Sequence, residues 1–499
     1  MATPVVSAGT LPAGLTASRP EPPLRSPTLP FVMATPAPRP ADRLILGQLL
    51  HFTGDPFAAP VDEVTRHERR GAVLLRDGCI HAIGPAEALR TAHPQAEVID
   101  HGDALILPGF VDAHAHYPQT AMIASWGKRL IDWLNTYTFP EEMRFADPAY
   151  AATIAGRYLD LLLANGTTTV TSFCTIHPAS VDALFEAAEA RGMAVVAGKT
   201  CMDRNAPDGL RDTAQSAYDD SRALLLKWHG RGRATYAITP RFSPTSTPEQ
   251  LEALGALWGE HPDCPMQTHL SEQTEELSWV ASLYPEARDY LDTYEQRGLL
   301  REGGLYGHAI WLTERERDRL REMGAAVVHC PTSNTFIGSG LFDMAATKAA
   351  GLSVGLATDT GGGSSFSMLR TMAAAYEIGQ LSGTALHPAQ LLWLATEGSA
   401  GALRMGNRAA GTGRSGGSGG ARPRLHPRHR PAPRRGRHPV GSRFPHHHDG
   451  RRPRGDGNLC GRDRAEAPSR VSRALLLPAR PCQPGAPLSG HTSAPIRRS

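Results

Sequence analysis

The stretch PGFVDAHAH, residues 108–116, decides the fold and points to the chemistry. Its apolar and small residues are typical of a buried strand, which ends on His114 and His116. Side chains alternate between the two faces of a strand, so residues two apart point the same way. The two imidazoles can therefore share a metal ion at about 2.0–2.1 Å per bond. A lone His-x-His pair is weak evidence, so the rest of the chain decides its meaning.

Downstream of this stretch, strand-like runs alternate with segments of helical spacing over roughly 250 residues. Eight strands alternating with helices predict an α/β fold, the (β/α)8 or TIM barrel. A doubly wound open sheet is the alternative, but no G-x-G-x-x-G motif follows the first strand. The predicted strands cover residues 109–116, 167–177, 194–203, 235–243, 265–272, 305–310, 325–334 and 353–363.

Three later predicted strands end in residues that a metal site needs. THLSE supplies His269 and Glu272, YGHAI supplies His308, and GLATDTGGG supplies Asp359. Each polar group ends an otherwise apolar strand, which is where a barrel places its catalytic residues. A hydrogen-bonded strand end explains any one of them equally well. The whole set in this order predicts a metal-dependent active site.

The chain divides into four predicted parts. Residues 1–40 are rich in Pro, Ala, Thr and Ser, and we expect this N-terminal extension to be disordered. Residues 41–107 contain short strand-like runs broken by turn residues, which predict a small β-sandwich-like domain. Residues 108–407 form the barrel domain. Residues 408–499 form a basic low-complexity tail, which we also expect to be disordered.

The tail differs sharply in charge from the rest of the chain. It contains 20 arginines, no lysine and 4 acidic residues, whereas residues 1–407 contain 32 basic and 45 acidic residues. A basic tail can bind nucleic acid electrostatically. An Arg-, Pro-, Gly- and His-rich run is also what a GC-rich gene yields when it is read out of frame. We therefore hypothesise a frameshift at or just after Asn407, which sequencing the gene across that codon tests, and we expect no specific nucleic-acid partner.

Composition excludes several other classes of protein. No run of about 18 apolar residues occurs, so no membrane-spanning helix is predicted. The N-terminus lacks the basic and apolar regions of a secretory signal. The seven cysteines are scattered singly, which fits a reducing compartment better than a disulfide framework. We therefore expect a cytoplasmic protein with no membrane partner.

Several segments between residues 44 and 407 resemble the guanine deaminases of the amidohydrolase superfamily. The bare metal ligands specify only the superfamily, whereas DWLNTYTFPEE and TPRFSPT resemble the guanine-specific branch. After Asn407 the chain departs from the family, whose members continue with apolar strands. The remaining segments of the resemblance are PGFVDAHAHYPQ, ANGTTTVTSFCTIH, GKTCMD, THLSE, VVHCPTSN and LATDTGGGSSFSML.

The resemblance implies a hydrolase that converts guanine and water to xanthine and ammonia in purine catabolism, with a homodimer as its assembly. It implies one Zn²⁺ per chain, bound by His114, His116, His269 and Asp359. It makes Glu272 the proton shuttle, places His308 against the reacting water, and makes Asp359 the acceptor of the water's proton. It also implies that the purine is bound by Gln119, Arg241, Phe242, His269, Glu272, His308 and Asp359.

Elementary chemistry supports these implied roles. Zinc lowers the pKa of a bound water to about 7, which makes hydroxide available at neutral pH. Burial would raise the pKa of Glu272 and suit it to proton transfer. Arg241 is a planar donor fork suited to the guanine carbonyl, and Phe242 offers a ring face for stacking. Without the resemblance, Arg241 is interpreted as a surface ion-pair partner and Phe242 as core. Trp126 and Trp133 lie near the first βα loop, where they are candidates for lining the pocket, but we favour core packing for both.

Metal number and substrate leave alternatives open. Lys199 ends the third predicted strand, where binuclear amidohydrolases carry a carbamylated lysine that bridges two metals. The resemblance is to the one-metal subtype, so we expect a single zinc. A second hypothesis keeps the fold and metal but changes the substrate to another aminated heterocycle. A third is a non-catalytic scaffold or an impaired product of a frameshifted gene. No P-C-x-x-C motif of the other zinc deaminase fold occurs.

Overall fold

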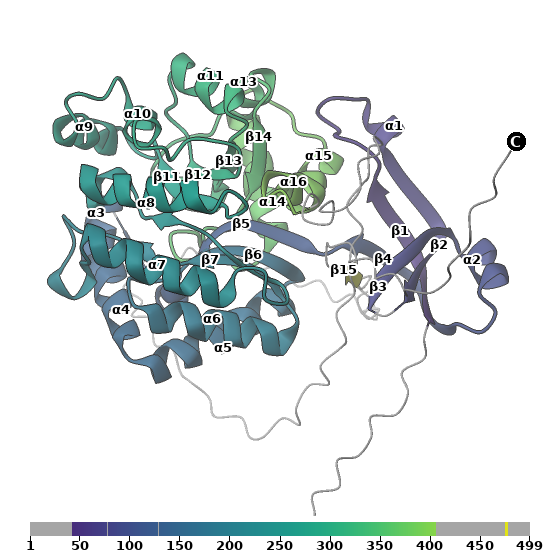
Figure 1. Cartoon of the computed structure of the whole chain (residues 1–499). Helices are drawn as coiled ribbons and strands as arrows, with labels where there is room; N and C mark the ends of the chain where they lie inside the picture. The colour runs from purple at the N-terminus through teal and green to yellow at the C-terminus, as the bar shows by residue number, and fades with distance from the viewer. Residues whose placement is uncertain (1–41, 77, 128, 406–474, 478–499) are drawn as a thin grey trace, which may run out of the picture. The chain divides into compact units, whose positions relative to one another are not determined.

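Eight parallel strands close into a barrel in the computed structural model of the chain, which describes residues 42–76, 78–127, 129–405 and 475–477 (Figure 1). One half of the barrel has the strand order β5-β6-β7-β9 and the other β11-β12-β13-β14. The predicted α/β barrel is confirmed, and all eight predicted strands are present. Their bounds are β5 (Phe110–His116), β6 (Thr167–Phe173), β7 (Ala194–Gly198), β9 (Ala234–Tyr236), β11 (Met266–Leu270), β12 (Gly304–His308), β13 (Ala326–His329) and β14 (Ser353–Leu356).

Two seams join the halves. At the first, Ile238 forms a parallel bridge with Met266. At the second, the Asp359 N–H donates to the His114 carbonyl at 2.9 Å, and the His116 N–H donates to the Thr360 carbonyl at 2.7 Å. The second seam therefore brings the end of the first barrel strand and the end of the last one into direct contact.

Amphipathic helices surround the strands, as Figure 1 shows for α5 to α8. Several begin at a threonine whose hydroxyl accepts a backbone N–H, among them Thr213, Thr247 and Thr313. Their apolar faces and the barrel strands form one large core that includes Trp228 and Trp258. The helices are α5 (Pro148–Ala164), α6 (Pro178–Arg191), α7 (Ala214–Trp228), α8 (Pro248–Glu260), α9 (Thr274–Leu283), α10 (Tyr290–Glu295), α11 (Glu314–Glu322), α12 (Pro331–Phe336), α13 (Met344–Ala349), α14 (Met368–Leu381), α15 (Pro388–Trp393), η6 (Leu394–Gly398) and α16 (Ser399–Ala402).

The connection from β5 to α5 is long and consists of short helical turns rather than one loop. It carries Leu130 and the segment DWLNTYTFPEE, residues 132–142, and Leu130, Trp133 and Leu134 line the pocket at the mouth of the barrel. Its elements are η1 (Tyr117–Met122), α3 (Leu130–Trp133), η2 (Leu134–Thr138), α4 (Phe139–Met143) and η3 (Arg144–Ala146). The remaining short elements are β8 (Thr200–Cys201), η4 (Asp208–Leu210), β10 (Thr239–Pro240) and η5 (Ser243–Thr245).

The four strands before the barrel form a separate sheet together with a fifth strand from the end of the chain. The order of this sheet is β15-β4-β1-β2-β3. Its fifth strand, β15 (Leu475–Leu477), comes from the tail and pairs parallel with β4, which the composition did not predict. The rest of the predicted tail after residue 407 and the predicted N-terminal extension lie outside the described residues. The other bounds are β1 (Asp42–Phe52), α1 (Val61–Val64), β2 (Thr65–Arg76), β3 (Cys79–Pro85), α2 (Ala86–Ala92) and β4 (Glu97–Pro108).

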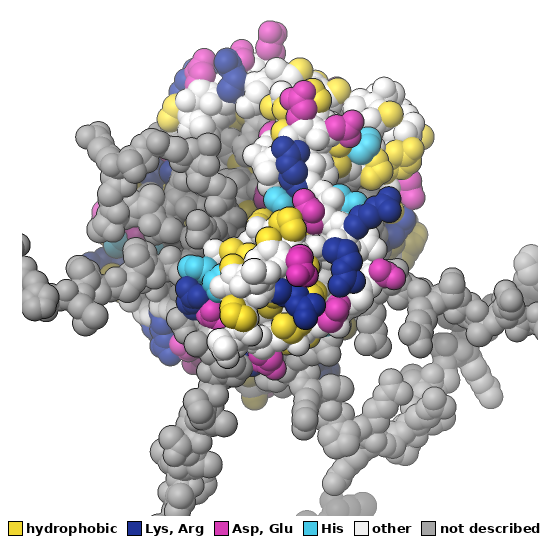
Figure 2. All heavy atoms as spheres, turned by 90° about the vertical axis from the view of Figure 1, so that its right-hand side faces the viewer, with side chains coloured by type: hydrophobic (Ala, Val, Ile, Leu, Met, Phe, Trp, Pro, Cys, Tyr) yellow, Lys and Arg dark blue, Asp and Glu magenta, His cyan; other side chains and the backbone are white. Residues whose placement is uncertain are grey.

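The described surface carries charges of both signs. Figure 2 shows basic and acidic side chains interspersed over the described part of one face. On the small sheet, Arg43 pairs with Glu97 at 2.9 Å and Arg76 pairs with Asp42 at 2.7 Å. Among the residues that the structure describes, no helix is both long enough and apolar enough to cross a membrane.

Candidate active site

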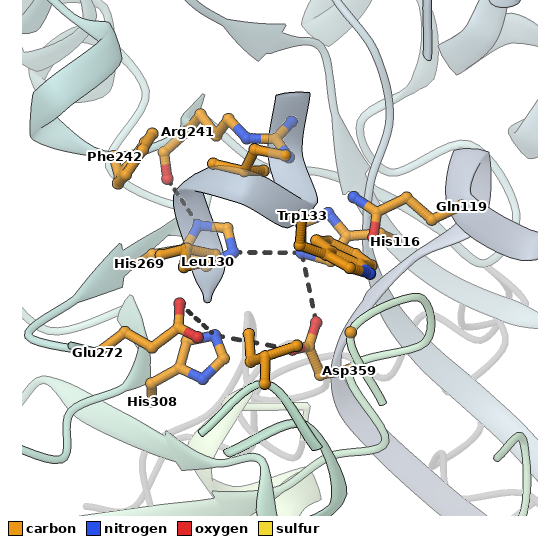
Figure 3. A pocket seen from close by; sticks show the side chains of 13 residues that line it. His116, Gln119, Leu130, Trp133, Arg241, Phe242, His269, Glu272, His308 and Asp359 are labelled. Carbon is orange, nitrogen blue, oxygen red and sulfur yellow. Dashed lines mark hydrogen bonds and ion pairs between the residues drawn. The ribbon is translucent and has the colours of Figure 1, made fainter. Parts of the chain in front are cut away.

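Four side chains from three strand ends converge at the mouth of the barrel. His114 and His116 lie on β5, His269 lies on β11, and Asp359 follows β14. The predicted alternation along β5 is confirmed, since both histidines reach the same point and their ring centroids are 5.2 Å apart. Figure 3 shows His116, His269 and Asp359 directed at one another.

The spacing of His114, His116 and His269 fits one metal ion, since one nitrogen of each lies within 4.8 Å of the other two. His116 Nε2 lies 3.2 Å from His269 Nε2 and 3.4 Å from Asp359 Oδ1, and His114 Nε2 lies 3.6 Å from the same oxygen. In a tetrahedral zinc site with bonds of about 2.1 Å, neighbouring ligand atoms are about 3.4 Å apart. The donor set, three imidazoles and a carboxylate, is also one that zinc accepts.

The protonation of these imidazoles also suits a metal. Burial lowers the pKa of His114, His116 and His269 well below the ordinary value, so the neutral ligand form is favoured. His269 Nδ1 donates to the Arg241 carbonyl at 2.7 Å, which leaves the Nε2 lone pair facing the other ligands. His114 Nε2 is buried and makes no hydrogen bond within the described part of the chain. A metal ion would satisfy it.

Cys330 also lies beside this cluster, within 4.8 Å of ligand atoms of His114, His308 and Asp359. Burial raises the pKa of its thiol well above the ordinary value, which disfavours the thiolate that binds metals. Cys330 is therefore better described as part of the packing between the strands than as a ligand.

Glu272 and His308 face the cluster from the opposite side of the pocket (Figure 3). His308 Nε2 lies 3.5 Å from Glu272 Oε2 and 3.7 Å from Asp359 Oδ2. The Ser339 hydroxyl donates to Glu272 Oε1 at 2.8 Å, and His308 Nδ1 donates to Asn334 Oδ1 at 2.8 Å. Both side chains are therefore held in place by a neighbour, so that Oε2 and Nε2 remain directed at the pocket.

Burial changes the acid strength of the two carboxyl groups in the pocket. Loss of solvation raises the pKa of Glu272 to about 7 and that of Asp359 to about 7. A carboxyl group that titrates near neutral pH can both accept and release a proton. The predicted burial effect on Glu272 is thus present.

Several residues at these strand ends adopt backbone angles that L-amino acids rarely use. The φ angles of Ser271, His308 and Asp359 are 50°, 66° and 47°. Such conformations occur mostly where the surrounding structure enforces them, and they cluster at functional sites. The side chains of His308 and Asp359, two of these residues, line the pocket.

The pocket above the cluster combines apolar walls with a few polar groups (Figure 3). Every residue that the sequence suggested for purine binding lines this pocket. His114, which was suggested only as a metal ligand, is not among the lining residues. Phe242 lines the pocket and also belongs to a small core cluster, as the core interpretation predicted, and its contact with the purine stays a prediction. The lining residues are His116, Gln119, Leu130, Trp133, Leu134, Arg241, Phe242, His269, Glu272, His308, Ile337, Asp359 and Gly362.

The structure corrects the interpretation of three other side chains. Trp133 lines the pocket besides packing in the core, and Trp126 is 69% exposed, so the core prediction is wrong for Trp126. Arg241 is no surface residue: it is 3% exposed and forms a buried ion pair with Glu142 at 2.8 Å.

Three residues that hold the site in place were not predicted from the sequence: Glu142, Asn334 and Ser339. Each contacts a predicted site residue that lies at least 26 positions away in the chain. The only available signal was their position inside the family-like segments DWLNTYTFPEE and VVHCPTSN for the first two.

Comparison with known proteins identifies the family of this chain. Residues 105–411 match the model of the Amidohydrolase family, and residues 71–96 match a bacterial Imidazolonepropionase-like composite domain. A guanine deaminase of Escherichia coli (strain K12) is 46% identical over 334 residues, which are 67% of this chain and 76% of that protein. The solved structure of E. coli guanine deaminase superposes with a TM-score of 0.71 at 43% identity, covering 72% of this chain and 84% of that one.

A further relative was solved with a ligand bound. The crystal structure of guanine deaminase from C. acetobutylicum with bound guanine in the active site has a TM-score of 0.68 at 29% identity, covering 73% of this chain and 87% of that one. The chain thus belongs to the amidohydrolase family, a class of barrel hydrolases. Within that class it belongs with the guanine deaminases, hydrolases that act on a C–N bond.

Proposed function

We propose that this protein hydrolyses guanine to xanthine and ammonia at one zinc ion per chain. The observation that carries the proposal is the convergence of three neutral imidazoles and a carboxylate beneath a pocket that also contains a buried arginine and a buried glutamine. The proposed metal ligands are His114, His116, His269 and Asp359. Bound zinc would supply a water of lowered pKa.

A single zinc is supported by the position of Lys199. Its amine pairs with Asp212, and both side chains are buried. A second carboxylate, Asp220, lies 4.0 Å from the same amine. The charged partners favour the ammonium form of Lys199, and they raise its pKa in spite of the opposing effect of burial. The ammonium form does not react to give the carbamate that bridges two metals, so this setting favours a structural role for Lys199.

Proton transfer is assigned to the two carboxyl groups and to the histidine between them. Asp359 would accept the proton of the reacting water. Glu272, with a pKa of about 7, would protonate a ring nitrogen of the purine. It would then take up the proton released when the new hydroxyl at C2 becomes a carbonyl and pass that proton to the departing amine, and the proton held by Asp359 would return Glu272 to its acid form. His308 Nε2 lies between these carboxylates and would orient the reacting oxygen. The net change is water added at C2 and ammonia released.

The purine would be held by side chains on the other wall of the pocket. Arg241 would donate to the carbonyl oxygen at C6, and Gln119 would bind the same edge of the ring. Phe242 would pack against the ring face. Leu130, Trp133 and Ile337 would shield the reacting carbon from bulk water.

The test is release of equal amounts of xanthine and ammonia from guanine, together with the variant Arg241→Leu. We expect R241L to lower kcat/KM for guanine about 100-fold, because it removes a charged hydrogen bond to the substrate and leaves the buried Glu142 carboxylate without its cation. Zinc content should stay unchanged. The matched control is Arg370→Leu, since Arg370 pairs with Glu377 on the exposed surface of α14. Absence of xanthine from the unmodified protein would contradict the proposed function.

A further inference from the structure

We propose that Glu142, which does not line the pocket, is a positioning residue that sets the preference for guanine. Its carboxylate holds Gln119 and Arg241 so that the two present one acceptor and one donor side by side to the purine. The inference rests on the proposed function and adds to it the residue that determines which purine edge is accepted.

Glu142 lies on α4 and is fully buried. Its Oε1 accepts from Gln119 Nε2 at 2.9 Å and from Arg241 Nη1 at 3.0 Å, and its Oε2 accepts from Arg241 Nη1 at 2.8 Å. One carboxylate therefore joins two pocket-lining residues, one from η1, which follows the first barrel strand, and one from the turn after β10. Phe139, one helical turn before Glu142, lies under the Arg241 guanidinium at 5.8 Å.

The carboxylate determines which way the Gln119 amide faces. An amide has one donor end and one acceptor end, whereas a carboxylate has only acceptors. The amide nitrogen of Gln119 must therefore face Glu142, and Oε1 must face the other way. Gln119 Oε1 is buried and has no hydrogen-bond partner among the described residues. A buried acceptor without a partner is costly, and an N–H group of a ligand would satisfy it.

A second contact restricts Gln119 from the opposite side. A Cβ atom built at Gly361 would lie 2.3 Å from Gln119 Oε1, so only glycine leaves room for the amide. Gly361 belongs to the glycine-rich turn that follows Asp359. The amide is thus held between Glu142 and the turn that also carries a proposed metal ligand.

The resulting pattern matches guanine and opposes adenine-like rings. Guanine presents a C6 carbonyl acceptor beside an N1–H donor. Arg241, whose Nη1 is engaged by Glu142, has further N–H groups for the carbonyl, and Gln119 Oε1 can accept from N1–H. A purine whose N1 is a bare acceptor would face Gln119 Oε1 with a second acceptor. Specificity of this kind arises from polar groups that the wrong ligand leaves unpaired.

The experiment compares ligand binding and turnover in the zinc-loaded full chain and in Glu142→Gln. Glutamine at this position offers a donor as well as an acceptor, so the Gln119 amide loses its single orientation. Hypoxanthine has the same C6 carbonyl and N1–H as guanine, whereas unsubstituted purine has neither. In calorimetric titrations we expect E142Q to weaken hypoxanthine binding about 10-fold or more and to change purine binding less than about 3-fold. For guanine, KM should rise more than kcat falls.

The adjacent glutamate provides the matched control. Glu141 pairs with Arg144 at 2.9 Å, outside the pocket, so Glu141→Gln should leave both affinities unchanged. Equal weakening of hypoxanthine and purine by E142Q would overturn the inference and indicate a merely structural role. Should E142Q fail to fold, Gln119→Leu replaces it, and unchanged hypoxanthine affinity in Q119L would also overturn the inference. If the unmodified protein releases no xanthine from guanine, the proposed function fails instead.

Discussion

Glu272→Gln is expected to lower kcat for guanine about 10³-fold while zinc content and KM stay close to those of the unmodified protein. Glutamine has nearly the same shape and can still accept the hydrogen bond from Ser339, which is 2.8 Å long in the structure. It cannot give a proton to the ring or carry one to the departing amine. Steady-state kinetics with guanine, combined with metal analysis of the same preparation, measures both quantities.

The size of this effect follows from the position of Glu272. Its Oε2 is the carboxylate oxygen nearest His308 Nε2, at 3.5 Å, and burial holds its pKa at about 7. The control is Glu275→Gln, because Glu275 pairs with Arg129 on the exposed surface of the same segment. E275Q should leave kcat unchanged. A kcat of E272Q within tenfold of the unmodified protein would assign the proton transfer to another group.

His269→Ala is expected to have the second large effect, loss of zinc together with activity. The unmodified protein should hold one zinc per chain, and H269A should retain well under half of that after dialysis. We expect kcat/KM to fall about 10³-fold or more, because metal stabilisation of the reacting oxygen is worth several kcal/mol. A chelator should inactivate the unmodified protein in the same way, and added zinc should restore it.

The control for this variant is His261→Ala, which changes a histidine at the end of α8, away from the cluster. H261A should keep one zinc and full activity. Two zinc ions in the unmodified protein would contradict the structural role of Lys199. Full activity in H269A without bound metal would remove the proposed mechanism altogether.

Much of the barrel could be predicted because its signals are local. Short apolar runs ending in polar residues recur at regular spacing, and all eight were found as strands between residues 110 and 356. The same locality explains the metal cluster, since His114 and His116 share a strand face and the other ligands end later strands. In a barrel, parallel strands bring all their carboxyl ends to one rim.

The supporting contacts could not be predicted, because they depend on side chains meeting across the rim. Glu142 reaches Arg241 over 99 positions of the chain, and Ser339 reaches Glu272 over 67. Nothing in the local pattern of either segment distinguishes these residues from solvated polar ones. The exposure of Trp126 could not be predicted for the same reason. The connection between β5 and α5 folds as short turns, and the burial of side chains in such turns follows no regular spacing along the sequence.

The sequence by itself determined the barrel, predicted a set of side chains suited to a metal and, through the resemblance, indicated the reaction. Periodicity and residue type are properties of a segment, so they can be recognised in the sequence alone. Only the tertiary structure decided how these groups are oriented and charged: that Lys199 is bound by Asp212, that Glu272 is buried enough to titrate near neutral pH, and that Glu142 turns the Gln119 amide. Orientation and desolvation depend on neighbours that are distant in the chain, and folding alone brings those neighbours together.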